Sequence, residues 1–371
     1  MSDPNTIRIL SFDGGGERGY LSLNFFQKFV QLWGIDPATI AQQFDVICGT
    51  SIGGIMALSL AFGLTPAELL PFFTSTDLLT RGGPYIFSLS SVLPSIRPPL
   101  AAKIALVLAD TPFYQSSGLD ANLYGSGLLA SNLRNQFESN TLQNLKTNVI
   151  IPSYNSGPPS NPVGEGTYVM FSNLNYPDFI GQNALISDVA LATSAAPIYL
   201  PLATLTGDTS GDEYIDGGVY QNNPASFGRT LAQMIKPNAN RCCVLSLGTG
   251  IGEIGFDPGN PSIIDSRVDP KMLKMFESNT LAFDSIQTIF ALFGIAATGG
   301  QESVAKALSL ESSYTLDQLY YYRFQPMLDP NLNTELDNTD PEILTYYEDT
   351  ATDYFNEDIE NIATFLGHLT A

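Results

Sequence analysis

Histidine is the scarcest informative residue in this sequence. The 371 residues include one, His368, which lies three positions from the C-terminus. A Ser-His-Asp triad needs an imidazole base held beside the nucleophile, and a chain end that frays is a poor place to hold one. We therefore expect His368 to be a solvent-exposed tail residue. A nucleophilic serine in this chain would need another base, and a carboxylate is the available type.

Cysteine is also scarce, with Cys48 and the adjacent pair Cys242 and Cys243. Adjacent cysteines rarely bridge each other, which favours a reducing compartment. No Cys/His cluster has the spacing of metal ligands, so we expect no metal. Residues 1–5 have neither the basic nor the apolar segment of a signal peptide, and no uninterrupted apolar run reaches about 18 residues. These absences predict a cytoplasmic protein, peripheral at membranes at most.

Basic residues are few relative to acidic ones. Sixteen Lys and Arg stand against 37 Asp and Glu, which gives a formal net charge of −21. This balance argues against a nucleic-acid partner and against constitutive adhesion to anionic membranes, since both require basic patches. Its simplest consequence is solubility. The hydrophobic content of 44% is enough for a large core, in one big domain or one domain with an appendage.

The stretch Gly49-Thr50-Ser51-Ile52-Gly53 separates a short apolar run from an apolar helical pattern over residues 52–62. This is the spacing of a nucleophile elbow, in which a serine occupies a sharp strand-to-helix turn. Glycines two residues on either side leave room for the backbone, and the N-terminal amides of the helix face an oxyanion on the acyl group. The pattern predicts Ser51 as a nucleophile, with an ordinary tight turn as the alternative.

A glycine-rich loop, Asp13-Gly14-Gly15-Gly16-Glu17-Arg18-Gly19, joins an apolar strand pattern at 7–12 to an amphipathic run at 20–33. Consecutive glycines leave backbone N–H groups uncovered and form an anion-binding concavity, to which Arg18 adds positive charge. A phosphate-binding loop is the alternative, but the P-loop Lys-Ser/Thr and a clear G-x-G-x-x-G are missing. The loop therefore fits an oxyanion hole better than a nucleotide cradle.

Asp216 ends a short strand pattern and is followed by Gly217 and Gly218. Alone, this motif is a plain turn. Strands that alternate with helices up to about residue 250 predict an α/β fold with a largely parallel central sheet, whose carboxyl edge would carry Ser51 and Gly15. Beyond residue 250, the segments 271–297 and 340–366 have helical patterns, and 319–324 is aromatic and β-like. The acidic side chains of 340–366 predict a solvated face on that helix.

Taken together, these three motifs resemble the patatin-like phospholipase family, and Ala192-Thr193-Ser194-Ala195-Ala196-Pro197 resembles the small-residue segment that precedes the family's acid. The resemblance covers roughly residues 6–250. It implies a three-layer patatin-like fold with a largely parallel central sheet flanked by helices. We expect residues 6–250 to form the catalytic core and the mostly helical residues 251–371 to pack on the same domain.

The resemblance implies a Ser51–Asp216 dyad, with the backbone amides of Gly14, Gly15 and Gly16 as the oxyanion hole. Gly49 and Gly53 are the elbow glycines, and Arg18 shapes the glycine loop or contacts an anionic head group. The predicted activity is that of a lipid acyl hydrolase of the phospholipase A or lysophospholipase type, without metal or organic cofactor. Its substrate is a phospholipid or other acyl lipid, met transiently at a membrane or micelle surface. The alternatives are a non-catalytic binding or scaffold protein and a phosphate- or nucleotide-binding module.

Three further expectations concern regulation and pH. The charge of −21 opposes approach to anionic bilayers, and similar pathogen-type proteins use protein activators, so we predict weak basal activity and a need for a protein activator, oligomerisation or a neutral interface. Residues 81–99 form either a cap over the acyl pocket or a packed surface loop, and residues 276–297 form either a lipid-contacting lid or a helix packed on the core. The sequence leaves the oligomeric state open. Burial would raise the pKa of Asp216 from about 3.9, whereas nearby amides would lower it, so we expect an acid limb of kcat/KM well below the histidine range.

Overall fold

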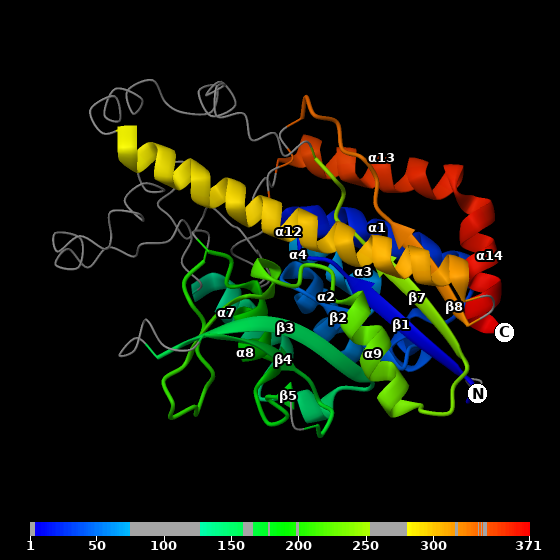
Figure 1. The fold of residues 1–371 in the computed structure, drawn as a ribbon, viewed down its shortest axis with the longest axis horizontal. Coiled ribbons are helices and arrows are strands. Elements are labelled where there is room, and N and C mark those ends of the chain that lie inside the picture. The colour runs from blue at the N-terminus through cyan, green and yellow to red at the C-terminus, as the bar shows by residue number, and fades with distance from the viewer. Residues whose placement is uncertain are drawn as a thin grey trace.

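A computed structural model describes residues 4–74, 127–158, 166–176, 179–197, 200–252, 280–315, 318–332, 334, 336 and 340–371. An eight-stranded sheet crosses the described part of the chain (Figure 1). Its order is β5 (Phe179–Ile180), β4 (Thr167–Phe171), β3 (Asn148–Gly157), β2 (Val46–Gly49), β1 (Thr6–Phe12), β7 (Arg241–Leu247) and β8 (Leu319–Phe324), and β6 (Glu213–Asp216) pairs with β3.

The centre of the sheet is parallel. Strands β3, β2, β1, β7 and β8 run in one direction, and β4 and β6 lie antiparallel to β3. Phe12 is opposite both Gly49 and Leu247, so three strands end at the same level. The loops that follow them therefore meet at one edge of the sheet, where open α/β sheets bind their ligands.

Helices cover both faces of this sheet, which confirms the predicted layered α/β fold. One face carries α1 (Gly19–Trp33), α2 (Ile52–Phe62), α7 (Gly127–Phe137), α8 (Ile186–Ser194), α13 (Pro341–Glu357) and α14 (Ile359–Thr370), and the other carries α9 (Ala225–Ile235) and α12 (Thr280–Tyr314). The shorter helices are η1 (Gly16–Arg18), η2 (Pro37–Gln43), α3 (Pro66–Leu69), α4 (Pro71–Thr74), η4 (Leu142–Asn144) and η5 (Gly217–Val219).

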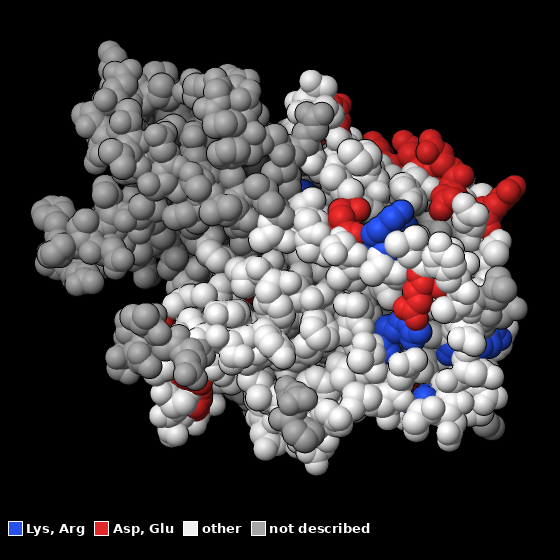
Figure 2. All heavy atoms as spheres, in the orientation of Figure 1, with Lys and Arg blue, Asp and Glu red and all other residues white. Residues whose placement is uncertain are grey.

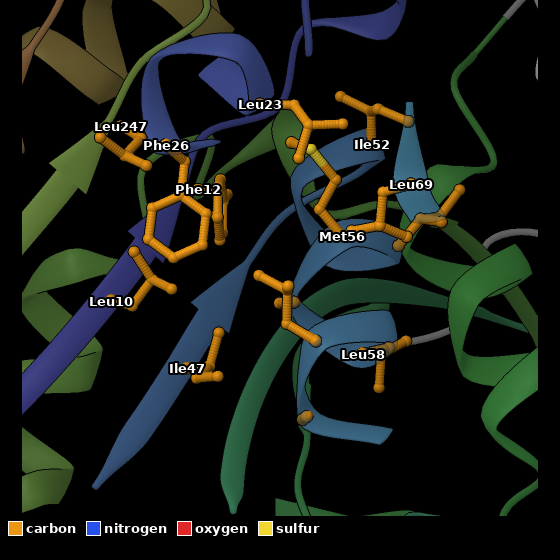
Figure 3. Packing of buried hydrophobic residues seen from close by; sticks show 14 of the residues in the cluster. Leu10, Phe12, Leu23, Phe26, Ile47, Ile52, Met56, Leu58, Leu69 and Leu247 are labelled. Carbon is orange, nitrogen blue, oxygen red and sulfur yellow. The ribbon is translucent and has the colours of Figure 1, made fainter. Parts of the chain in front are cut away.

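The core divides according to the alternation of side chains along each strand. On β1, Leu10 and Phe12 point into the larger cluster, and Ile7 and Ile9 belong to the smaller cluster under α9 and α12. Helix α2 is apolar on all sides because it lies within the larger cluster, with every residue from 52 to 61 buried. Figure 3 shows its side chains packed between β1, β2 and α1. The elbow helix is therefore held on all sides.

The C-terminal third adds an edge strand and two helices to the same layers. Strand β8 confirms the β-like pattern at 319–324 and pairs in parallel with β7. The predicted single helix over 340–366 is wrong: it breaks at Asp358, whose carboxylate accepts a hydrogen bond from the Tyr322 hydroxyl at 2.7 Å. After the break, α14 lies at the start of β1, where Arg8 Nε donates to the Leu369 carbonyl at 2.6 Å.

The predicted solvated face of this segment is confirmed. Acidic side chains form a red area over α13 in Figure 2. The exposed acidic residues of the segment are Glu342, Glu348, Asp349, Asp353 and Glu357 on α13 and Glu360 at the start of α14. Residues 81–99 lie outside the described residues, and of 276–297 only the helical backbone from residue 280 is described, so both lid hypotheses stay predictions. None of the helices in the described ranges is both long and apolar enough to cross a bilayer.

Candidate active site

Ser51 occupies a strained turn between β2 and α2. Its φ of 58° and ψ of −127° lie in a region that residues with side chains rarely adopt, and such strain persists only where the surroundings impose it. Here they do: the Thr50 N–H donates to the Phe12 carbonyl at 3.2 Å, and the Ser51 N–H donates to Thr193 Oγ1 at 3.1 Å. The backbone is thus fixed on both sides of a half-buried serine.

The two glycines around Ser51 are required by close backbone contacts. A Cβ on Gly49 would lie 2.0 Å from the Gly53 carbonyl oxygen, and a Cβ on Gly53 would lie 2.5 Å from the Phe12 carbonyl oxygen. Neither obstacle is a flexible side chain that could move aside. Any other residue at these positions would displace the strand or the helix that forms the turn.

Asp216 is buried beside Ser51 at the end of β6. Its N–H donates to the Ala195 carbonyl at 3.0 Å, and its carboxylate Oδ1 accepts the Gly218 N–H at 2.7 Å. Ser51 lies beside this carboxylate, close enough for its hydroxyl to lower the pKa of Asp216. Two residues 165 positions apart in the sequence are thereby brought together, and the carboxylate is only 1% exposed.

Burial raises the pKa of Asp216 to about 7, although the Ser51 hydroxyl and the Gly218 N–H oppose the rise. This pKa runs against the expectation from the sequence of an acid limb well below the histidine range, and it places the expected limb near 7 instead. Desolvation of the charged form outweighs the donors that stabilise it. The resulting group holds its proton up to neutral pH in the free protein.

The glycine loop lies directly against Ser51, since a Cβ on Gly14 would be 3.1 Å from Ser51 Cβ. The Gly14 N–H is engaged with the Asn222 carbonyl at 3.1 Å. The Gly15 and Gly16 N–H groups have no hydrogen-bond partner among the described residues. Of the three predicted oxyanion donors, the structure thus leaves two available.

Arg18 contacts the loop itself. Its backbone N–H and its Nε both donate to the Gly15 carbonyl, at 3.2 and 3.5 Å. On the other side, the Leu336 carbonyl accepts the Glu17 N–H at 2.7 Å and would lie 2.1 Å from a Cβ on Gly16. The loop is therefore held between its own arginine and the chain segment that follows β8.

A buried ion pair under the loop was missed by the sequence reasoning. Arg323 of β8 donates from Nη2 to Asp13 Oδ2 at 2.6 Å and from Nη1 to Ser246 Oγ at 2.9 Å. Burial raises the pKa of Asp13 to about 6, while Arg323 opposes the rise. The only signal in the sequence was a charged residue inside an otherwise aromatic and apolar strand.

His368 is far from this site. Its ring stacks on Tyr320, with centroids 3.8 Å apart, and Tyr320 is opposite Cys243, near the start of β7. The carboxyl edge of the sheet lies four residues further along, or roughly 13 Å at 3.3 Å per residue. The expectation of an exposed tail histidine is wrong, because α14 is regular and the ring is half-buried. In the described ranges no group of three or more His, Cys, Asp and Glu could hold a metal.

The chain is similar to known proteins over most of the residues that form this site. A family model described as patatin-like phospholipase matches residues 10–227. Patatin-like protein 2 of Arabidopsis thaliana is 32% identical over 267 residues, which cover 66% of this chain and 60% of that protein. A cGAMP-activated phospholipase of Vibrio cholerae is 32% identical over 60% of this chain and 57% of its own length. Human calcium-independent phospholipase A2-gamma is 26% identical over 92% of this chain and 38% of its own length. The chain thus spans less than two thirds of these relatives.

Proposed function

Because the chain belongs to the patatin-like phospholipase family, we propose that it is a lipid hydrolase of the phospholipase A or lysophospholipase type that uses a Ser51–Asp216 dyad. The observation that carries the proposal is the position of the serine: it occupies a strained turn beside a carboxyl group that is removed from water and whose pKa its hydroxyl lowers. A nucleophile that lies next to a base is the arrangement that covalent hydrolysis requires.

In the proposed reaction, Asp216 takes the hydroxyl proton as Ser51 Oγ bonds to the ester carbonyl carbon. The carbonyl oxygen becomes an oxyanion facing the Gly15 and Gly16 N–H groups. Collapse of this intermediate breaks the ester bond, and the proton on Asp216 passes to the departing alcohol. A water molecule then attacks the acyl-serine and gives its proton to Asp216. The fatty acid leaves, and Ser51 regains its hydroxyl proton from Asp216.

The environment of Asp216 suits this role. General bases act best when their pKa lies near the working pH, and burial brings the pKa of this carboxyl to about 7. An exposed aspartate with the usual value near 3.9 would be a far weaker base. The carboxylate form is the active one, so proton removal above neutral pH switches the site on.

For Arg18, the contacts favour shaping of the loop over contact with a head group. The peptide unit is planar and trans, so the Gly15 carbonyl and the Gly16 N–H point in opposite directions from one plane. Arg18 holds that carbonyl through two donors. We therefore propose that Arg18 aims the Gly16 N–H at the oxyanion.

The substrate, surface and activator stay proposals. A phospholipid or related acyl lipid at a membrane or micelle surface fits the family. The net charge of −21 still motivates an activator, which we first predicted to be a protein. Two bacterial relatives are cGAMP-activated phospholipases, so assays of this chain should be run with and without a cyclic dinucleotide. The cytoplasmic location also stays a prediction.

A fluorophosphonate probe tests the proposal, because it reacts with activated serines. We expect labelling of the wild-type chain that maps to the peptide containing Ser51 and is lost in Ser51→Ala. A non-catalytic scaffold or a phosphate-binding module would give no labelling in either protein, with the fold intact by circular dichroism. Lipidomics of a mixed-lipid digest would then identify the cleaved position, head group and acyl length.

A further inference from the structure

Asn222 makes two hydrogen bonds to Gly14 of the glycine loop. Its carbonyl accepts the Gly14 N–H at 3.1 Å, and its side-chain Nδ2 donates to the Gly14 carbonyl at 3.2 Å. Thr249 Oγ1 donates to the same carbonyl at 3.0 Å. Asn222 is 6% exposed and Thr249 is fully buried, so solvent has little access to these bonds.

These bonds determine the direction of a neighbouring amide. The Gly14 carbonyl and the Gly15 N–H belong to one planar trans peptide and point oppositely. When Asn222 and Thr249 hold the carbonyl from one side, the Gly15 N–H is directed to the other. The Gly15 N–H is one of the two donors that our proposed function assigns to the oxyanion hole.

The second N–H of the Asn222 amide is satisfied by α12. Nδ2 donates to Gln301 Oε1 at 2.9 Å, and Gln301 is 3% exposed. An amide nitrogen has two hydrogens, and here one is directed to Gly14 and the other to Gln301. Without the glutamine oxygen, the second hydrogen would be buried without an acceptor, and the amide would rotate to find one.

We infer that Gln301 is a positioning residue, which holds the oxyanion hole in shape through Asn222 and Gly14. This inference rests on the proposed function. It assigns to α12, which lies outside the residues matched by the family model (10–227), a direct role in the geometry of the glycine loop. Glu302 on the same helix lies 3.8 Å from Arg323, which pairs with Asp13. Helix α12 is therefore connected to Asp13 through Arg323 and to Gly14 through Asn222.

The test is a double-mutant cycle on a soluble short-chain ester, with kcat, KM and the Ki of a trifluoromethyl ketone that forms a hemiketal oxyanion on the serine. Removal of an oxyanion donor costs about 100- to 1,000-fold in kcat, and Gln301→Met should misalign one and cost about tenfold. The Ki of the ketone should rise by the same factor, and KM should stay within about twofold. Asn222→Ala should lower kcat at least as much, and the double variant should match Asn222→Ala.

Glu311→Gln is the matched control, since Glu311 lies on the same helix but pairs with Arg229 of α9. We expect it to lower stability and leave kcat unchanged. Additive losses in the double variant, or an unchanged kcat in Gln301→Met, would overturn the inference. If Gln301→Met does not fold, Asn222→Ala alone must lower kcat and raise the Ki of the ketone by the same factor. Unchanged values would refute the positioning of the Gly15 N–H through Asn222. A wild-type chain without turnover or fluorophosphonate labelling would refute the proposed function instead.

Discussion

Replacement of Asp216 by asparagine should stabilise the fold above neutral pH while it removes the proposed base. The pKa of this carboxyl rises from 3.8 to about 7 on folding. At about 1.4 kcal/mol per pKa unit, deprotonation of the buried group costs the folded state about 4 kcal/mol. Asparagine keeps the acceptor for the Gly218 N–H and adds an NH2 group that can donate to Ser51 Oγ. It carries no charge to desolvate.

The stability of the wild type depends on pH because proton binding by Asp216 is coupled to folding. Between pH 3.8 and 7 the unfolded chain has released this proton and the folded chain has kept it, so the stability of the wild type falls as pH rises through that window. The penalty is complete above pH 7 and absent below pH 3.8. The advantage of Asp216→Asn over wild type should therefore grow by about 3 kcal/mol between pH 5 and pH 8.

Differential scanning calorimetry at the two pH values measures this advantage. With an unfolding entropy of about 2.1 cal/mol/K per residue, 4 kcal/mol in a chain of 371 residues corresponds to a Tm increase of about 5 °C at pH 8. We expect about 2 °C at pH 5. A Tm at pH 8 equal to or below that of the wild type would show that Asp216 is not a desolvated carboxylate, and the argument for its basicity would fail.

Three further outcomes are expected. The acid limb of kcat/KM on a soluble ester should lie near 7, set by Asp216, and it should be unchanged in His368→Ala; a limb that disappears in that variant would make the histidine the base. Arg323→Met should lower the free energy of unfolding by about 3–5 kcal/mol, because it leaves the Asp13 carboxylate buried without its partner. Chemical denaturation measures this loss, and an Arg323→Met variant as stable as the wild type would refute the stabilising role of the ion pair. The double variant Arg323→Met with Asp13→Asn should recover only part of the lost stability, since the packing of the arginine is also lost. Hydrolysis of anionic vesicles at low salt should be slow relative to zwitterionic vesicles, given the net charge of −21; equally fast hydrolysis by the purified chain would remove the charge argument for an activator.

Local patterns predicted the parts of the fold that local physics determines. The apolar run at 52–62 became α2 with the same bounds, because a helix buried on all sides needs no polar face. The strand–turn–helix order around Ser51 and the glycine loop was equally visible. Asn155-Ser156-Gly157 had the composition of a loop but continues β3, since Ser156 Oγ donates to the Glu213 carbonyl at 2.9 Å and Asn155 Nδ2 to Asp212 at 2.9 Å. These partners are distant in sequence.

The site's electrostatics depended on contacts that the sequence does not display. Arg323 reaches Asp13 across 310 residues, and Gln301 reaches Asn222 across 79. The two opposing effects on Asp216 were visible from its neighbours, but their balance depends on burial, which only the packed structure determines. The break at Asp358 likewise follows from the tertiary partner Tyr322, since no glycine or proline marks it.

The most direct measurement of the dyad is turnover of one soluble ester by the wild type, Ser51→Ala, Asp216→Asn and the double variant, each checked for fold by circular dichroism. Residues that work as a unit lose about as much singly as together. We therefore predict that each single variant falls to the level of the double variant. An Asp216→Asn protein that keeps a substantial fraction of wild-type turnover would contradict the account.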